Sequence, residues 1–108
     1  MKKHRLLAVA VSFSLVSITA QAQDADAAKT LLKKNDCFKC HALDKKKDGP
    51  PYKEVAQKHK GEADATEKLF KHMTTGPKVK IDGKEEEHKV IKGSDEQIKN
   101  LVAWILSL

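Results

Sequence analysis

The feature that most constrains this chain is the stretch Cys37-Phe38-Lys39-Cys40-His41, which holds the only two cysteines among its 108 residues. The spacing C-x-x-C-H is typical of covalent haem c attachment. Two thiols at this spacing form thioether bonds to the haem vinyl groups, and the adjacent histidine then lies against the iron. We therefore predict one haem c, attached through Cys37 and Cys40, with His41 as its proximal axial ligand. The second ring nitrogen of such a ligand donates a hydrogen bond that fixes the ring.

Three other interpretations of the cysteine pair are weaker. A redox dithiol of the thioredoxin type needs a βαβ setting, which this sequence does not predict. A structural zinc site needs two further ligands at short spacing, and the chain has no second cysteine pair. A plain disulfide accounts for the two cysteines but not for the histidine beside them. Haem attachment explains all three residues.

The N-terminus has the pattern of an export signal. Three basic side chains lie within the first five residues, and the uncharged run 6–18 follows. Ala20 and Ala22 then stand at the spacing that a signal peptidase reads. We predict that residues 1–22 are a cleaved secretory signal peptide and that residues 23–108 form one periplasmic domain. An uncleaved anchor is the weaker alternative, because spanning a bilayer takes roughly 20 apolar residues, so we expect no stable membrane insertion after cleavage.

Cleavage also changes the charge. The full chain has 21 Lys and Arg against 15 Asp and Glu, a formal charge of +6. The signal peptide removes Lys2, Lys3 and Arg5, which leaves 18 basic residues against the same 15 acids and a charge of about +3. No basic patch with interleaved aromatic residues is present, so we expect no nucleic-acid partner. A domain this small often needs a staple, and a haem would complete its core.

The rest of the chain has the pattern of helices and loops. Four stretches have helical patterning: residues 25–35, residues 52–59, a stretch that follows Asp64 or Thr66 and ends at residue 75, and a stretch that begins at Ser94. The last is the best defined, because Ser94 and Gln97 stand at capping-box spacing and an apolar stripe follows. Residues 78–93 are polar and irregular, and no segment alternates like a strand. The sequence therefore predicts an all-α fold of about four helices around one haem.

Three segments carry a family resemblance: Cys37-Phe38-Lys39-Cys40-His41-Ala42, Gly49-Pro50-Pro51-Tyr52-Lys53-Glu54-Val55-Ala56 and Leu101-Val102-Ala103-Trp104-Ile105-Leu106. From about Ala27 onward the chain resembles a class I cytochrome c of the small bacterial type, similar to cytochromes c551 and c552. The resemblance implies that the first and last helices cross at right angles beside the haem, with Trp104 in their contact. It also implies that the Pro50 carbonyl accepts the hydrogen bond of His41 and that Tyr52 packs near the haem.

The sequence departs from this family at the distal ligand of the iron. Members usually place a methionine, in a Met-Pro stretch, a few residues before the last helix, and this chain has no methionine there. In the family pattern that position falls on His88, which implies bis-histidine ligation by His41 and His88. By composition alone, His88 is a solvent-exposed histidine in a charged loop.

Other candidates for the distal position remain open. Met73 is the only methionine left after cleavage, and its helical spacing from Leu69 and Phe70 indicates a core residue. His59 and His72 lie on or near helices, and we expect both to face solvent. The last alternative is an open or labile distal site that binds a small gas or peroxide, as a sensor or a modest enzyme.

Ligation decides the function. With both axial positions filled, the protein only exchanges single electrons, and histidine in place of methionine sulfur gives it a low reduction potential. With an open distal side, carbon monoxide would bind rapidly to the reduced protein. The sequence contains no nucleophile–base constellation and no paired acids arranged for catalysis. We therefore expect an electron carrier and not an enzyme.

Lysines cluster near the attachment motif, at Lys39, Lys45, Lys46 and Lys47. The resemblance implies an exposed haem edge ringed by docking residues. A positive ring there would steer the protein toward a redox partner with an acidic docking face. The alternative interpretation is a solvated loop. We expect a monomer or a small subunit of a redox complex.

Overall fold

The computed structural model of the chain describes residues 8–15 and 23–108. The elements in these ranges are α1 (Ala25–Lys34), the 3₁₀ turn η1 (Cys37–Lys39), α2 (Tyr52–Lys58), α3 (Ala65–Thr75), β1 (Lys78–Ile81), β2 (Lys84–Glu87) and α4 (Asp95–Leu106). Most of the predicted signal peptide, including the cleavage point after Ala22, lies outside the described residues. None of the helices described here is both long enough and apolar enough to cross a membrane.

Helices α1 and α4 each begin at a residue whose side chain caps the first turn. Asp24 caps α1 by accepting a hydrogen bond from the Ala27 N–H at 3.0 Å. At α4, Ser94 Oγ accepts from the Gln97 N–H at 3.1 Å, and Gln97 Oε1 accepts from the Ser94 N–H at 2.9 Å. The predicted capping box is therefore confirmed. Such caps satisfy N–H groups that the first helical turn leaves unpaired, and each contributes about 1 kcal/mol.

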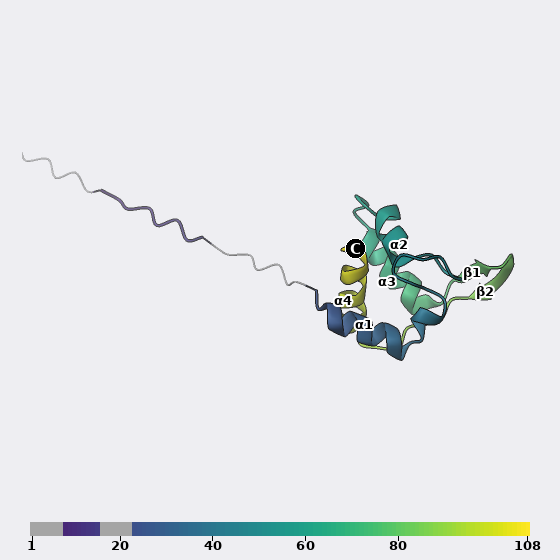
Figure 1. The fold of residues 1–108 in the computed structure, drawn as a ribbon. Helices are drawn as coiled ribbons and strands as arrows, with labels where there is room; N and C mark the ends of the chain where they lie inside the picture. The colour runs from purple at the N-terminus through teal and green to yellow at the C-terminus, as the bar shows by residue number, and fades with distance from the viewer. Residues whose placement is uncertain (1–7, 16–22) are drawn as a thin grey trace, which may run out of the picture.

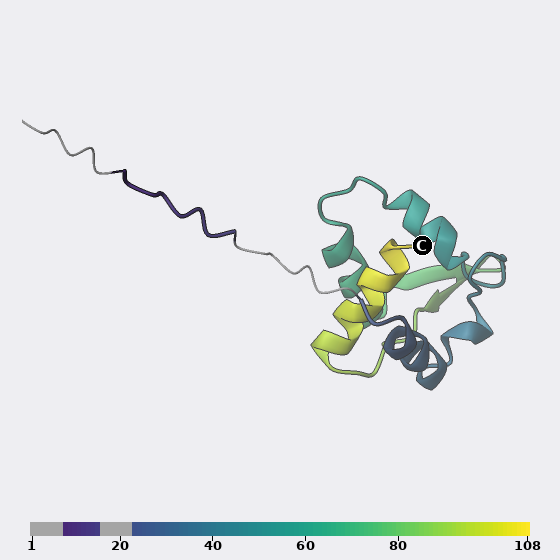
Figure 2. The same ribbon diagram turned by 60° about the vertical axis from the view of Figure 1, so that its left-hand side comes forward.

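The core lies where α4 crosses α1, with α2 and α3 packed beside them (Figures 1 and 2). Both views show α4 running steeply across α1, as the resemblance implies. The largest fully buried side chains are Leu32, Leu101, Val102 and Ile105. Burial of each contributes about 1.5–3 kcal/mol by removing apolar surface from water. Trp104 of α4, which is 7 % exposed, joins this core and packs edge-on against Tyr52 of α2, with ring centroids 6.5 Å apart.

A β-hairpin replaces part of the irregular segment expected over residues 78–93. Strands β1 and β2 pair antiparallel in the register Lys78↔Glu87, Val79↔Glu86, Lys80↔Glu85 and Ile81↔Lys84. Asp82 and Gly83 join them, and both have left-handed φ values, of 50° and 77°. This is the backbone that a tight Asp-Gly hairpin turn requires, and opposite charges across the strands add support. The hairpin projects from a body that is otherwise helical (Figure 1), so the predicted all-α fold of about four helices needs this one local correction.

Candidate functional site

A cavity of about 670 Å³ lies between η1, α2, α3, the hairpin and the segment that follows β2. Its volume is within the range of about 300–1,000 Å³ that is usual for small-molecule and cofactor sites. All six side chains that we assigned to the cofactor line it: Cys37, Cys40, His41, Pro50, Tyr52 and His88. The fold therefore gathers residues from three separate parts of the chain around one space.

Cys37 begins η1 and Cys40 directly follows it, shortly after the end of α1. Asp36 precedes this turn with a left-handed φ of 56°, where α1 has ended. The N–H groups of Cys40 and His41 both donate to the Cys37 carbonyl, at 3.2 Å and 2.9 Å. Both thiols are free and half-buried, and burial is the main reason that the pKa of Cys37 lies above its ordinary value. Two free thiols on one wall of the cavity are what two thioether bonds to a single porphyrin require.

The imidazole of His41 is held on several sides. Its Nδ1 lies 2.8 Å from the Pro50 carbonyl oxygen. Because a carbonyl only accepts, Nδ1 carries the proton and Nε2 keeps the lone pair that a metal needs. Tyr52 stacks on the ring with centroids 4.9 Å apart and planes 21° apart. A Cβ at Gly49 would lie 2.5–2.9 Å from three ring atoms, so only glycine fits there.

His88 lies between β2 and α4 and is half-buried, in contrast to the exposed loop histidine that composition suggests. Its backbone N–H donates to the Pro77 carbonyl at 2.8 Å. Its Nδ1 lies 2.9 Å from the Lys89 carbonyl oxygen, so this nitrogen too carries the proton and Nε2 is the free acceptor. Burial is the main reason that the pKa of His88 lies below its ordinary value, which favours the neutral ring.

The separation of the two imidazoles fits an iron between them. Imidazole–metal bonds are about 2 Å long, and the bonding nitrogen lies about 1 Å from its ring centre. Two such ligands on opposite sides of one metal therefore hold their ring centres about 6 Å apart. The centroids of His41 and His88 are 6.2 Å apart. Together with the two thiols, these rings make a donor set that suits haem c with an imidazole on each face.

The other two candidate histidines also line the cavity, so the expectation that they face solvent is wrong. His72 on α3 is half-buried, and its ring centroid lies 4.5 Å from that of His88. Burial is the main reason that the pKa of His72 lies below its ordinary value. Helical periodicity gave no sign of this contact, because it cannot show that the end of α3 meets the segment after β2. Met73 is buried in the core, as predicted, and it also lines the cavity.

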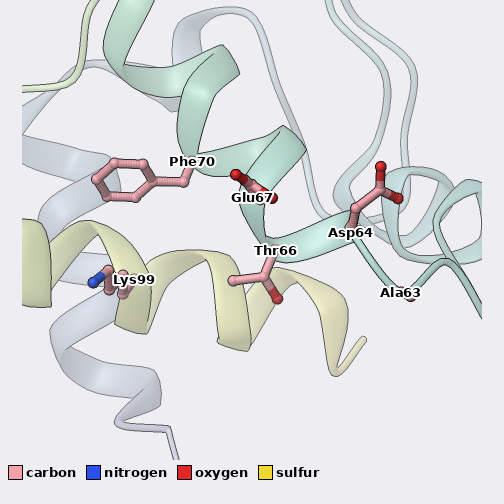
Figure 3. A pocket seen from close by; sticks show the side chains of 6 residues that line it. All are labelled: Ala63, Asp64, Thr66, Glu67, Phe70 and Lys99. Carbon is pink, nitrogen blue, oxygen red and sulfur yellow. The ribbon is translucent and has the colours of Figure 1, made fainter.

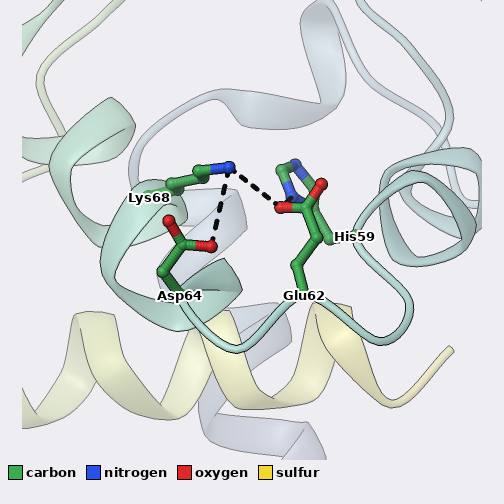
Figure 4. Close-up of polar contacts among 4 residues, drawn as sticks. All are labelled: His59, Glu62, Asp64 and Lys68. Atoms are coloured by element: carbon green, nitrogen blue, oxygen red, sulfur yellow. Dashed lines mark hydrogen bonds and ion pairs between the residues drawn. The ribbon is translucent and has the colours of Figure 1, made fainter.

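His59 belongs to a polar cluster at one wall of the cavity (Figure 4). Its Nδ1 donates to a Glu62 carboxylate oxygen at 3.0 Å, and its side chain is only 15 % exposed. Lys68 pairs with Glu62 at 3.2 Å and with Asp64 at 3.6 Å. The hydrogen bond from His59 is the main reason that the pKa of Glu62 lies below its ordinary value. The ring nitrogen that faces Glu62 is therefore engaged within this cluster.

A second hollow of about 420 Å³ lies between α3 and α4 (Figure 3). Its lining residues are Ala63, Asp64, Thr66, Glu67, Phe70 and Lys99. Lys99 lies over the ring of Phe70, with its Nζ 5.9 Å from the ring centroid. The lining contains no cysteine and no histidine, so this hollow lacks the groups that haem attachment and ligation need.

Comparison of the amino-acid sequence with known proteins finds a matching family model and similar relatives. The family model described as Cytochrome c matches residues 25–108. The chain is 32 % identical over 107 residues to cytochrome c-551 of Pseudomonas aeruginosa, covering 99 % of this chain and 98 % of that protein. It is 36 % identical over 108 residues to cytochrome c-552 of Nitrosomonas europaea, covering 100 % of this chain and 99 % of that protein.

Solved structures give the same result. The class 1 cytochrome MtoD from Sideroxydans lithotrophicus ES-1 superposes with a TM-score of 0.78 at 62 % identity, over 80 % of this chain and 97 % of that one. Wild-type cytochrome c552 of Nitrosomonas europaea superposes with a TM-score of 0.63 at 31 % identity, over 74 % of this chain and 98 % of that one. The likeness therefore extends well beyond the attachment motif.

Proposed function

Because the chain belongs to the cytochrome c family and carries one haem c attached through its C-x-x-C-H motif, we propose that it is a periplasmic one-electron carrier. We further propose that His41 and His88 are the two axial ligands and that the reduction potential is therefore low. In this proposal the protein is an electron carrier and not an enzyme.

One observation carries the proposed ligation. The rings of His41 and His88 both line the cavity with their centroids 6.2 Å apart, and each has its Nδ1 on a backbone carbonyl. Metal-bound histidines almost always donate their other ring N–H in this way, because the bond fixes the tautomer and raises the basicity of the ligating nitrogen. Met73, the other candidate for the distal position, lines the same cavity but is packed in the core cluster.

The protein's own residues prepare the site for electron exchange. When bound, the haem supplies the centre at which one electron is gained or lost. Cys37 and Cys40 hold it covalently, Tyr52 and Gly49 restrict the proximal ring, and the Pro50 carbonyl keeps the proton on His41 Nδ1. Filled axial positions leave no coordination site for a substrate, which suits a carrier. Two imidazoles lack the soft sulfur that raises the potential in methionine-ligated relatives.

The alternative proposal, an open distal site that binds a gas or peroxide, requires His88 to stay away from the iron. The half-buried position of His88 and its separation from His41 support ligation instead. Rapid binding of carbon monoxide to the reduced native protein would reverse this preference.

A redox titration of the holoprotein beside His88→Met tests the proposal. Sulfur ligation should raise the potential by at least about 0.1 V, a modest part of the roughly 0.8 V over which axial ligands tune haem. His59→Met is the control at another histidine that lines the cavity, and it should leave the potential close to that of the native protein. Equal potentials for the native protein and His88→Met would contradict ligation by His88.

A further inference from the structure

Among the described residues, Asn35 is the one buried polar side chain, at 3 % exposure. It ends α1 and stands two positions before Cys37. Its Nδ2 donates to the Leu31 carbonyl at 3.0 Å and to the Lys92 carbonyl at 3.1 Å, and its Oδ1 accepts from the Lys92 N–H at 2.8 Å. The first bond caps a helix. The other two pair the amide with the backbone of a residue 57 positions away.

This pairing connects the two halves of the haem site. Lys92 follows His88 by four residues in the distal segment (residues 88–92) that leads to α4, while Asn35 stands two positions before the attachment turn (residues 37–40). A second link between the same segments is the ion pair of Asp36 and Lys89 at 3.6 Å. Both of its side chains are about half exposed (54 % and 52 %), and surface ion pairs contribute little. The buried amide is therefore the stronger polar link between attachment turn and distal segment.

The distal segment has two further backbone anchors, both on the α3 side. The His88 N–H donates to the Pro77 carbonyl, and the Ile91 N–H donates to the Met73 carbonyl, each at 2.8 Å. These bonds hold the segment to the end of α3 and to the residues just after it. In contrast, the polar contacts described here between the segment and the chain around Cys37 come from Asn35 and Asp36. Movement of the segment away from the haem would leave the buried amide of Asn35 unpaired, which is costly.

We propose that Asn35 is a positioning residue for the distal ligand: by clamping the backbone of Lys92 to the attachment turn, it sets how firmly His88 is held against the iron. The proposal rests on the proposed ligation by His88. Asn35 also lines the haem cavity, but its side-chain hydrogen bonds go to Leu31 and Lys92 and not to His88, so in this proposal it acts through the backbone of residues 88–92.

The chain contains a matched control. Asn100 of α4 forms the same pairing with the backbone of Asp24, with its Oδ1 accepting from the Asp24 N–H at 2.8 Å and its Nδ2 donating to the Asp24 carbonyl at 2.9 Å. This clamp joins the start of α1 to α4, and neither residue lines the haem cavity. Loss of either clamp should destabilise the protein, but only loss of the Asn35 clamp should loosen His88.

The test compares the holoproteins Asn35→Leu and Asn100→Leu in two measurements, the urea midpoint of unfolding and the rate at which carbon monoxide binds the reduced protein. Carbon monoxide binds only after the distal ligand has left the iron. We expect Asn35→Leu to bind it about tenfold faster than the native protein, because opening of the distal segment in this variant no longer leaves a buried amide unpaired. The binding rate of Asn100→Leu should stay within about twofold of the native rate, however far its urea midpoint falls.

A second variant, Asn35→Asp, allows the same test if Asn35→Leu does not fold. Asn35→Asp keeps the size of the side chain and the acceptor for the Lys92 N–H, but it turns an acceptor toward the Lys92 carbonyl, so it should also speed carbon monoxide binding. Equal rates in the Asn35 and Asn100 variants would show that Asn35 is only structural, while ligation by His88 would stand. His88→Ala separates the two proposals: if it does not accelerate carbon monoxide binding, ligation by His88 fails, and the positioning role fails with it.

Discussion

At the scale of single residues, His41 and His88 have the same local arrangement. Each keeps Nδ1 on a backbone carbonyl, that of Pro50 at 2.8 Å or that of Lys89 at 2.9 Å, and each leaves Nε2 free. The proximal ring is restrained further by the stacked Tyr52. Unequal restraint of this kind predicts that the distal ring leaves the iron first when the protein is perturbed.

The close approach of Gly49 to His41 gives a direct prediction. A methyl group at this position would lie 2.5–2.9 Å from three atoms of the His41 ring, so Gly49→Ala must displace the ring. Such overpacking costs about 1–3 kcal/mol. We expect a lower thermal midpoint and an altered ferric absorption spectrum.

Gly93→Ala is the control for that substitution. Its new methyl would lie 3.1 Å from the tip of the Leu31 side chain and 3.2 Å from Gln97 Oε1, and it would meet no atom of the His41 ring. The spectrum of Gly93→Ala should match that of the native protein. A native spectrum for Gly49→Ala would argue against the tight seat of the proximal ring.

The His59–Glu62 hydrogen bond predicts a pH dependence of stability. It holds the pKa of Glu62 below its ordinary value, so the folded state releases this proton more readily than the unfolded chain. The resulting stabilisation is present above the unfolded pKa of about 4.3 and is lost as the pH falls through the folded value. Glu62→Gln should therefore flatten the acid limb of the unfolding free energy between about pH 5 and pH 3.

Denaturant unfolding across this pH range provides the measurement, with Asp44→Asn in the exposed loop as control. Because Glu62 is exposed, the effect should be small. An acid limb that is identical in native protein and Glu62→Gln would contradict a bond from His59.

The residues of the site differ in how far the sequence reveals them. Cys37, Cys40 and His41 are contiguous, so their motif identifies them without a structure. His88 emerges only through the family pattern, because its charged neighbours suggest solvent exposure. The contact of His72 with His88 and the pairing of Asn35 with Lys92 join distant segments, and no periodic pattern marks such pairs.

At the scale of elements, the helices were predictable because their apolar faces repeat at helical spacing and Asp24 and Ser94 are strong caps. The hairpin was not predicted, because lysine and glutamate dominate its strands and obscure the alternation of Val79 and Ile81, which are half-buried. The dipeptide Asp82-Gly83 was the signal available in the sequence.

The turn of the hairpin supplies a prediction at this scale. Gly83 has φ 77°, which costs a residue with a Cβ about 1–2 kcal/mol. Gly83→Ala should lower the thermal midpoint and speed amide exchange in β1 and β2. Asp82→Asn is the control, because asparagine tolerates the left-handed region well, and it should behave like the native protein. Unchanged exchange in Gly83→Ala would contradict the turn.

At the scale of the whole molecule, the core and the cavity share their lining. Leu32, Leu101 and Ile105 are buried in the core and also border the cavity. A haem seated there would extend the same apolar interior, which explains how a small domain with few aromatic residues forms a core. The sequence indicated that a haem would complete the core, but it could not show that four helices and a hairpin enclose the space together.

Charge at the molecular surface predicts how the carrier meets other molecules. Lys39, Lys45, Lys46 and Lys47 are all exposed beside the attachment turn. Oxidation of the reduced protein by anionic ferricyanide should slow as salt is raised, because ions screen attraction beyond about 10 Å at 0.1 M. Lys45→Glu with Lys46→Glu should weaken that salt dependence. A rate that does not change with salt would contradict a positive docking surface.

The most direct test of ligation by His88 is the ferric absorption spectrum of the native holoprotein, extended into the near-infrared and recorded beside His88→Met. Methionine sulfur bound to ferric haem gives a weak charge-transfer band that bis-histidine haem lacks. We predict a low-spin native spectrum without this band and its appearance in His88→Met. A native spectrum that already contains the band would assign the distal position to Met73, and a high-spin native spectrum would mean an open iron; either result would contradict the bis-histidine carrier.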